Sequence, residues 1–185
     1  MSTDADPVAE KTDLSLRQAR PHEASALARL HLAARRAAMP AMPPPVHGDA
    51  ETQAWFADLL RRTDHEIWVA ERAGAVVGYL VLEGPGWLHS LYVRPELTGH
   101  GIGSVLIDVA KGLRPSGLQL WVFETNVRAQ RFYRRHGFAE VERTDGADNE
   151  ERAPDIRMAW PEQEGISTST RLVPSTKPRS EETEA

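Results

Sequence analysis

Cysteine is absent from this chain of 185 residues, and so are long hydrophobic runs. The first absence excludes disulfide bonds, thiolate ligands to a metal and a cysteine nucleophile, and it favours a reducing, cytoplasmic location. The second excludes a membrane-spanning helix, which needs about 20 apolar residues. The polar, acidic N-terminus is also unlike a secretory signal. We therefore expect a cytoplasmic protein with no membrane partner.

The chain also has no excess of basic over acidic side chains. The net charge is −5, of which −3 lies in residues 1–13 and −2 in residues 161–185, so the segment 14–160 carries equal numbers of acidic and basic side chains. Proteins that bind nucleic acids present a basic surface to the phosphates. The sequence therefore offers no footprint for a nucleic-acid partner.

Apolar periodicity is confined to the middle of the chain. Residues 1–12 and 161–185 lack it, and the second stretch is rich in Ser, Thr, Pro and charge, so we expect two disordered tails. Residues 13–160 are enough for one well-cored domain and too few for two of ordinary size.

Within this domain, alternating and helical apolar periods predict strands first and then strand–helix–strand–helix–strand, a mixed α/β pattern built on one sheet. Pro21 is expected to open the first helix, Asp49 to cap the second, and residues 102–113 to form the third. The fourth helix is expected to start at Asn126 and to end at Gly137. Strands are expected at residues 14–19, 67–72, 76–83, 87–93, 118–123, 138–144 and 155–160.

A glycine-rich loop leads into the third helix. The chain breaks at Pro95 and then carries glycines at positions 99, 101 and 103. Glycines leave backbone N–H groups unshielded, and a helix N-terminus adds free donors and partial positive charge, so the loop indicates a phosphate or pyrophosphate site. No lysine follows, which excludes a P-loop, and the third glycine comes one residue too early for a dinucleotide fingerprint. A plain strand-to-helix turn is the alternative.

A second motif follows the loop after one helix and one strand. It reads Asn126-x-x-Ala129-x-x-Phe132-Tyr133-x-x-x-Gly137-Phe138, and the first reads Leu91-Tyr92-Val93-x-Pro95 followed by the three glycines. With both motifs in this order, residues 14–160 resemble the GNAT superfamily of acetyl-CoA-dependent N-acetyltransferases. The resemblance implies an acyltransferase with an α/β (α+β) fold: a single mixed, mostly antiparallel sheet of about seven strands, about four flanking helices, and a splayed strand pair at the cofactor slot.

The same resemblance implies how acetyl-CoA, the acyl donor, is held. Loop amides would hold the pyrophosphate, and the exposed edge of the strand 87–93 would pair with the pantetheine arm. A bulge in that strand would open the slot, and an N–H near Leu91 or Tyr92 would polarise the thioester carbonyl. Thr98 stands where members of the family often carry Gln or Arg. Its hydroxyl side chain brings no charge to the phosphate site. The expected cofactor-binding residues are Leu91, Tyr92, Val93, Thr98, Gly99, His100, Gly101, Ile102, Gly103, Ser104, Asn126 and Tyr133.

Direct attack of an amine on the thioester needs an acid and a base. Tyr133 is the expected general acid for the leaving thiolate, because a phenol with a reference pKa of about 10 stays protonated at neutral pH; a core role is the alternative. Asn126 is expected to cap its helix, and the resemblance implies that its side chain also bonds the pantetheine. His89 and Glu124 are candidate bases, and a water chain is the alternative. The remaining histidines show no metal-ligand spacing, and we expect no metal.

The acceptor is the least defined part of the sequence. The loop 145–155 holds five carboxylates and one arginine, which fits either a solvated hairpin loop or an acidic lip that attracts a cationic amine. By resemblance, this loop and the first two helices form the acceptor site, with Trp55, Phe56, Glu150 and Glu151 as candidates. We expect a primary amine of a small molecule or peptide, and a homodimer is compatible. A non-catalytic acyl-CoA-binding or sensing module and a toxin that acetylates aminoacyl-tRNA stay open as alternatives.

Overall fold

A computed structural model describes residues 14–161 of the chain, and the expected disorder of both tails concerns residues that lie almost wholly outside this range. Seven strands form one sheet in the order β1-β2-β3-β4-β5-β7-β6. Neighbours are antiparallel except for β4 and β5, so the expected mixed fold is confirmed. The strands are β1 Leu14–Gln18, β2 His65–Arg72, β3 Ala75–Glu83, β4 Trp87–Val93, β5 Leu118–Phe123, β6 Ala139–Thr144 and β7 Asp155–Trp160.

Four α-helices cover the sheet: α1 Ala24–Ala37, α2 Asp49–Leu59, α3 Ile102–Leu113 and α4 Val127–Arg135. The cap of α2 was expected at Asp49, and this is wrong, because the N-cap is Gly48, whose N–H donates to the Glu51 carboxylate at 3.0 Å. The cap of α4 is confirmed: Asn126 Oδ1 accepts from the Ala129 N–H at 3.1 Å. None of the helices within residues 14–161 has the length and apolarity to cross a membrane.

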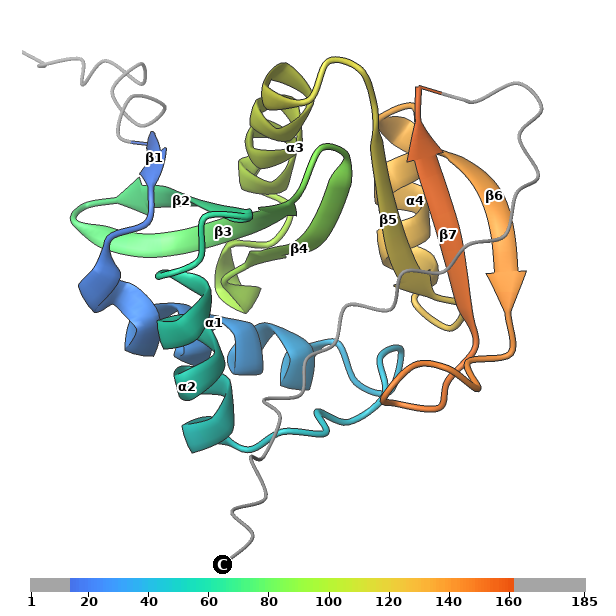
Figure 1. The fold of residues 1–185 in the computed structure, drawn as a ribbon, viewed down its shortest axis with the longest axis horizontal. Helices are drawn as coiled ribbons and strands as arrows, with labels where there is room; N and C mark the ends of the chain where they lie inside the picture. The colour runs from blue at the N-terminus through green and yellow to red at the C-terminus, as the bar shows by residue number, and fades with distance from the viewer. Residues whose placement is uncertain (1–13, 162–185) are drawn as a thin grey trace, which may run out of the picture.

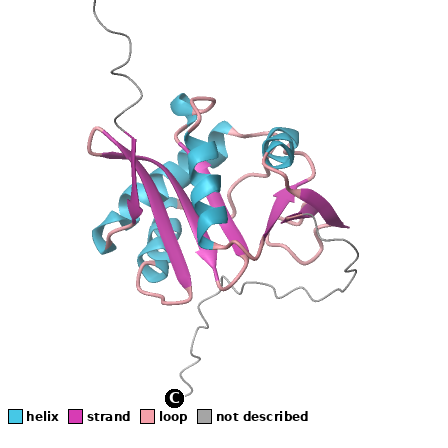
Figure 2. Cartoon of the chain, turned by 90° about the horizontal axis from the view of Figure 1, so that it is seen from above, coloured by secondary structure: helices cyan, strands magenta, loops and turns pink. Residues whose placement is uncertain are grey.

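The sheet divides into two parts. The strands β1 to β4 form an antiparallel meander with α1 and α2 on one face and α3 on the other, and β5 to β7 form the second part with α4 (Figure 1). The parts meet at a single registered pair, Trp87 with Gln119, after which β4 and β5 diverge. The view from above shows the same division of the strands into two groups (Figure 2). The expected splayed pair is therefore confirmed.

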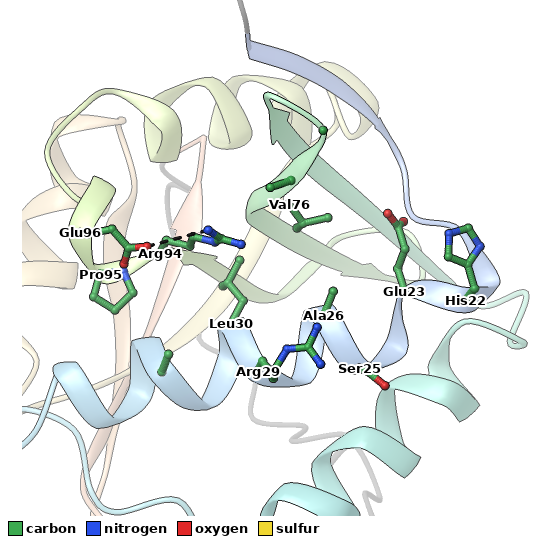
Figure 3. A pocket seen from close by; sticks show the side chains of 13 residues that line it. His22, Glu23, Ser25, Ala26, Arg29, Leu30, Val76, Arg94, Pro95 and Glu96 are labelled. Carbon is green, nitrogen blue, oxygen red and sulfur yellow. Dashed lines mark ion pairs between the residues drawn. The ribbon is translucent and has the colours of Figure 1, made fainter.

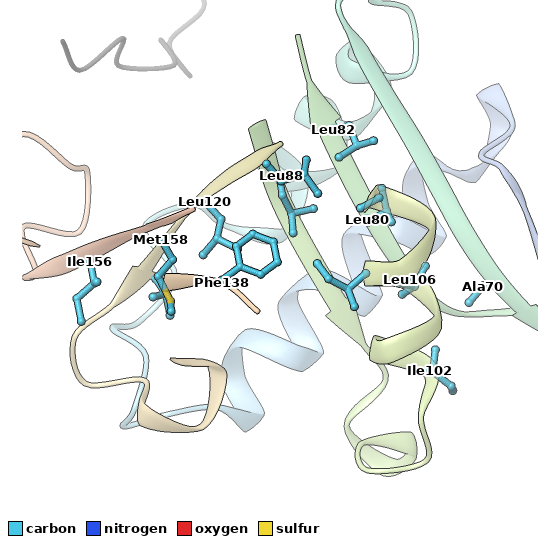
Figure 4. Close-up of a cluster of buried hydrophobic side chains, with 14 of the residues drawn as sticks. Ala70, Leu80, Leu82, Leu88, Ile102, Leu106, Leu120, Phe138, Ile156 and Met158 are labelled. Carbon is cyan, nitrogen blue, oxygen red and sulfur yellow. The ribbon is translucent and has the colours of Figure 1, made fainter. Parts of the chain in front are cut away.

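One hydrophobic core joins the two parts on the α3 face. Leu80 and Leu88 from the first part meet Leu120 and Met158 from the second, and all four are buried (Figure 4). A second core lies between the sheet and the pair α1 and α2, around Phe56. Since full burial of a large apolar side chain contributes about 1.5–3 kcal/mol, these cores hold the diverging strands in place.

Two glycines bring α3 close to its neighbours. A Cβ at Gly78 on β3 would lie 3.1 Å from the side chains of Ile102 and Leu106, and a Cβ at Gly103 would lie 3.4 Å from the Phe132 ring. The absence of side chains at these positions therefore sets the N-terminus of α3 tightly against both β3 and α4. The third glycine of the loop serves this packing.

The bulge expected in β4 is present. Val81 on β3 pairs with Ser90, but the next residue, Leu82, pairs with Leu88, so His89 is the extra residue on β4. In a regular strand, successive side chains point to opposite faces. The bulge instead directs both His89 and Ser90 to the face that α1 and α2 cover, where the His89 ring lies 5.5 Å from the ring of Trp55.

Candidate active site

The open edge of β4 faces the gap that the diverging strands leave. The Arg94 N–H donates to the Val77 carbonyl of β3 at 2.9 Å. Because backbone groups alternate in direction along an antiparallel pair, Tyr92 also addresses β3, whereas Leu91 and Val93 direct their N–H and C=O groups toward β5. Of the two amides expected near the thioester, the one at Leu91 therefore faces the gap and the one at Tyr92 does not.

The glycine loop presents backbone N–H groups at the N-terminus of α3. Gly99 and Gly101 have φ values of +91° and +82°, which suit glycine alone, and an added Cβ at either position would meet nothing within 4 Å. The Val105 N–H is the first to bond within the helix, to the Gly101 carbonyl at 3.1 Å. The amides of Ile102, Gly103 and Ser104 are therefore free of helical acceptors and lie beside the open edge of β4.

Three residues of this loop that were expected to bind the cofactor differ in the donor groups that they can offer to a ligand. The His100 N–H approaches the Leu97 carbonyl at 3.4 Å, and its side chain is exposed. Thr98 is exposed, and its hydroxyl lies 3.4 Å from the Arg94 carbonyl. The Ser104 amide belongs to the first turn of α3. The loop is thus a cradle of backbone amides with little help from charged side chains.

Tyr133 lies on α4 and is half-buried between two rings. Its ring centroid is 5.2 Å from that of Phe132 and 5.6 Å from that of Phe138. Burial, and then the neighbouring Tyr92 phenol, raise the pKa of Tyr133 above its usual value. The phenol therefore keeps its proton at neutral pH, which a general acid requires, while the ring also packs against the core.

The two residues that flank the β5–α4 turn have different surroundings. Asn126 uses its Oδ1 for the cap of α4, and no residue between 14 and 161 accepts a hydrogen bond from its NH₂ group. Glu124 is exposed and paired with Arg143. The amide is thus free to donate to a ligand, whereas the carboxylate is already neutralised by a cation.

His89 is half-buried at the bulge and donates to or accepts from Ser90, whose Oγ lies 2.9 Å from its Nδ1. Burial, and then the nearby His65, lower the pKa of His89 to about 4, so the imidazole is neutral at pH 7. Trp55 covers it as a half-buried wall. Phe56, expected as part of the same wall, has no exposed surface and supports the site from behind instead.

Sequence reasoning missed His31 and Tyr79. His31 Nδ1 lies 2.7 Å from the Tyr79 hydroxyl, although 48 residues separate them, and the His31 ring packs edge-on against Tyr92 at 4.9 Å. Burial, then Arg35 and His89, lower the pKa of His31 to about 3. The only signal in the sequence is that His31 shares an apolar helix face with Leu27, a position typical of a core histidine.

The acidic loop after β6 is tied to the connection between α1 and α2. Arg35 on α1 pairs with Glu151 at 2.8 Å, and both side chains are largely buried. His47 lies 3.0 Å from Glu150, and the Thr125 hydroxyl donates to the Ala41 carbonyl at 2.8 Å. The two expected acceptor carboxylates therefore both have partners on the α1–α2 side, while Asp145, Asp148 and Glu150 are exposed to solvent.

Arg35 has a further peculiarity. Its Nε is buried and has no hydrogen-bond partner among residues 14–161. An unpaired buried donor costs about 1–3 kcal/mol, so its presence in a folded protein calls for an explanation, of which a role in a functional site is one. The position of Arg35, between Tyr92 and Glu151, supports its inclusion on the acceptor side.

A groove of about 520 Å³ lies elsewhere, between α1 and the turns at the ends of β2 and β4 (Figure 3). Leu30 and Val76 form its apolar floor, and Arg29 and Arg94 stand at its walls. None of the residues expected from the sequence to bind or react lines it. Within residues 14–161, no group of three or more His, Asp or Glu side chains could hold a metal ion.

Comparisons with known proteins agree on one family. Residues 63–140 match the family model described as an acetyltransferase (GNAT) domain. The peptidyl-lysine N-acetyltransferase YjaB of Salmonella typhimurium is 31% identical over 113 residues, which are 60% of this chain and 75% of that protein. The solution structure of apo YjaB from Escherichia coli superposes with a TM-score of 0.64 at 25% identity, covering 80% of this chain and 97% of the other.

A second curated relative matches over a smaller share. The amino-acid acetyltransferase of Mycobacterium tuberculosis is 37% identical over 90 residues, which are 43% of this chain. The matched region spans about half, 49%, of that relative's length. The range 63–140 matched by the family model includes the open edge of β4, the glycine loop and α4.

Proposed function

The chain belongs to the GNAT family of acetyltransferases, and on this premise we propose that it transfers the acetyl group of acetyl-CoA to a primary amine within a ternary complex. One observation carries the proposal: the N-terminus of α3, with its free amides, packs against the open edge of β4, where a Cβ at Gly103 would lie 3.9 Å from the Leu91 side chain. A pyrophosphate and an extended amide-bearing arm, joined as in CoA, fit this pair of features.

The backbone would hold the donor. Amides from Gly99 to Ser104, with the one at His100 already engaged, would bind the pyrophosphate. Leu91 and Val93 would pair with the pantetheine as a neighbouring strand does, and Asn126 would donate its free NH₂ group to it. The Leu91 N–H would then stabilise the negative oxygen of the tetrahedral intermediate.

Tyr133 would complete the transfer. The amine nitrogen forms a bond to the thioester carbon, the C–S bond breaks, and the leaving thiolate takes the phenolic proton of Tyr133. The phenol recovers a proton from the nitrogen of the product as the amide forms. Because the amine begins as an ammonium ion, a separate group must first remove one proton. We assign this role to His89, whose imidazole is neutral at pH 7, rather than to Glu124, which is exposed and paired with Arg143.

The acceptor would be a small molecule or a peptide with a primary amine. The names of the two relatives, an amino-acid acetyltransferase and a peptidyl-lysine N-acetyltransferase, share this group. Trp55, Arg35 and Glu151 would form the acceptor side, with Glu150 at its edge. A homodimer stays a prediction.

The test is a thiol-release assay with acetyl-CoA and a panel of amino acids, peptides and polyamines, followed by mass identification of the product. Tyr133→Phe should lower kcat by about 100-fold or more, because general acid catalysis contributes at least that much, with CoA binding retained. Thr52→Val, which removes a buried hydroxyl on α2, should leave kcat unchanged. Wild-type turnover in Tyr133→Phe would refute the acid role, and tight CoA binding without any turnover would favour an acyl-CoA sensor.

A further inference from the structure

The groove between α1 and the ends of β3 and β4 is the largest feature that the proposed reaction does not use (Figure 3). It exists because small residues line it on both sides, with Ala26 and Ala33 on α1 and Gly74 in the turn between β2 and β3. Leu30 and Val76 close it from below, and both are buried. The groove is therefore a depression of about 520 Å³ with an apolar floor.

Positive charge in this groove exceeds negative charge. Arg29 on α1 is exposed, and no acidic side chain in the described part of the chain pairs with it. Arg94 has one acidic neighbour, Glu96, at 4.0 Å, and both side chains are largely exposed. Glu23 also lines the groove, but its carboxylate accepts hydrogen bonds from Arg17 at 2.6 and 2.9 Å. An occupant with an apolar centre and acidic flanks would therefore suit the groove.

The first described strand starts beside the groove. Leu14, the first residue of β1, pairs with Arg72 at the end of β2, and Gly74, two residues further along, belongs to the groove wall. Residues 1–13 are thus attached at the same end of the sheet as the groove. Since an extended chain spans about 3.3 Å per residue, the four steps from residue 10 to Leu14 cover about 13 Å.

The sequence of residues 1–13 has the pattern that the groove calls for. The segment carries four carboxylates and one lysine, a net charge of −3. Asp4 and Asp6 precede the apolar run Pro7-Val8-Ala9, and Glu10 follows it. The groove has the same order with the opposite charge, because Leu30 of its floor lies between the two arginines (Figure 3).

We propose that residues 4–10 dock in this groove of their own chain, with Val8 on the apolar floor and the carboxylates toward Arg29 and Arg94. A segment with so few apolar residues does not fold alone, and as a free peptide it would bind weakly. Attachment beside the groove raises its local concentration to about the millimolar range, which favours this segment over a separate partner. The docking is independent of the acetyl transfer proposed above.

Paramagnetic broadening in NMR spectra of the full chain tests the docking. Because the chain has no cysteine, Ala5→Cys allows a nitroxide spin label to be attached at a single position. At low salt the label should broaden the amide signals of Ala26, Ala33 and Gly74, relative to the same sample with the nitroxide reduced. In about 1 M salt, where the Debye length is about 3 Å, the broadening should fall by about half or more.

Charge variants of the labelled protein distinguish docking from chance proximity. Arg29→Ser should remove most of the broadening, and so should Asp6→Asn combined with Glu10→Gln. Arg61→Ser is the matched control, because Arg61 is an exposed arginine that pairs with Asp58 at 3.2 Å outside the groove. It should leave the broadening unchanged. The amide spectrum of each variant shows directly that the protein is folded.

Three results would overturn the proposal. The first is an absence of broadening in the groove, or broadening that Arg29→Ser does not reduce. The second is broadening of the groove by a label at Ser180→Cys instead, which would assign the groove to the C-terminal segment. The third is equal broadening in a mixture of unlabelled ¹⁵N protein with spin-labelled protein that lacks ¹⁵N, which would assign it to a second copy. None of these measurements requires turnover, so their outcome is separate from that of the acetyl-transfer assay.

Discussion

The donor side and the acceptor side of this site are built in different ways. The donor side consists of the glycine loop, the open edge of β4 and the start of α4, and it presents mainly backbone groups. The acceptor side consists of side chains from α1, α2, β3, β4 and the loop after β6, joined by contacts between residues up to 116 positions apart. A backbone cradle survives changes of side chain, whereas a side-chain site changes with each of them. We therefore expect the donor specificity to be fixed by the fold and the acceptor specificity to change with side-chain substitutions.

Gly101→Val should break the donor side alone, with the largest effect. A β-branched residue cannot adopt the φ of +82° at low cost, so the amides of the cradle must move. We expect the Kd for CoA to rise about 100-fold, or about 2.7 kcal/mol, in calorimetric titrations of a protein that remains folded.

Gly112→Ala is the matched control for this change. Gly112 lies within α3, and an added Cβ would meet nothing within 4 Å. The substitution should stabilise the helix by about 0.5–1 kcal/mol and leave the Kd unchanged. A Gly101→Val protein that binds CoA as wild type does would show that the loop is only a turn.

Arg35→Met should break the acceptor side alone. It keeps the aliphatic stem but leaves the Glu151 carboxylate unpaired in a largely buried position, which costs about 1–3 kcal/mol. The KM for the amine should rise about 10-fold, a change of about 1.4 kcal/mol, while the KM for acetyl-CoA stays constant.

Arg36→Met provides the control on the same helix. Arg36 pairs with Asp49 at 2.7 Å, but both side chains are mostly exposed, and such pairs contribute about 0–1 kcal/mol. Neither KM should move. If Arg35→Met raised the KM for acetyl-CoA as much as that for the amine, the two sides would not be separable.

Acid should destabilise the protein through the acceptor side. The pKa values of His31 and His89 lie near 3 and 4 in the fold, below the usual value, so between about pH 6.5 and pH 4 the unfolded chain binds more protons than the folded one. Stability is therefore present above pH 6.5 and is lost as the pH falls. Each histidine contributes up to about 1.4 kcal/mol per pH unit.

Urea titrations at several pH values would check this slope. His31→Asn should flatten it, and His22→Gln, which changes an exposed histidine in the 3-10 turn before α1, should not. An identical slope in wild type and His31→Asn would contradict the buried, neutral state of His31. Arg35, His65, Tyr79 and Tyr92 face the two rings and stay unchanged in these variants.

Thr98→Arg should give the smallest effect and should sharpen the account of the donor side. A guanidinium at this exposed position would add a charge to a cradle made of amides, where it is screened by salt. CoA binding should tighten about 3-fold, or about 0.7 kcal/mol, and the gain should vanish at high salt. Tightening of more than about 30-fold would indicate that backbone amides contribute less than proposed.

Local chemistry explains which features the sequence could predict. The positions of the strands, the cap at Asn126, the glycine turn at Gly137 and the free amides of the loop depend on residues within a few positions of one another. The wrong cap at Asp49 is also local: the Glu51 carboxylate accepts from the Gly48 N–H, so Gly48 is the cap and the helix begins one residue earlier than a cap at Asp49 would give.

The acceptor side was not predictable for a different reason. Whether His89 faces α2 depends on where the β3–β4 register slips, and a shift of one residue would turn its side chain to the other face. The contacts of His31 with Tyr79 and of Arg35 with Glu151 depend on how helices dock against the sheet. Phe56 was expected in the wall and is buried behind it for the same reason.

Equilibrium and turnover measurements on one preparation test the central claim most directly. The protein is titrated with acetyl-CoA, and the same sample is then supplied with the amine panel while CoA release and product mass are followed. We expect binding of acetyl-CoA, release of one CoA for each amine acetylated, and no acetylated residue on the protein itself. Binding without release across the whole panel, or release that requires an acetyl-enzyme, would contradict it.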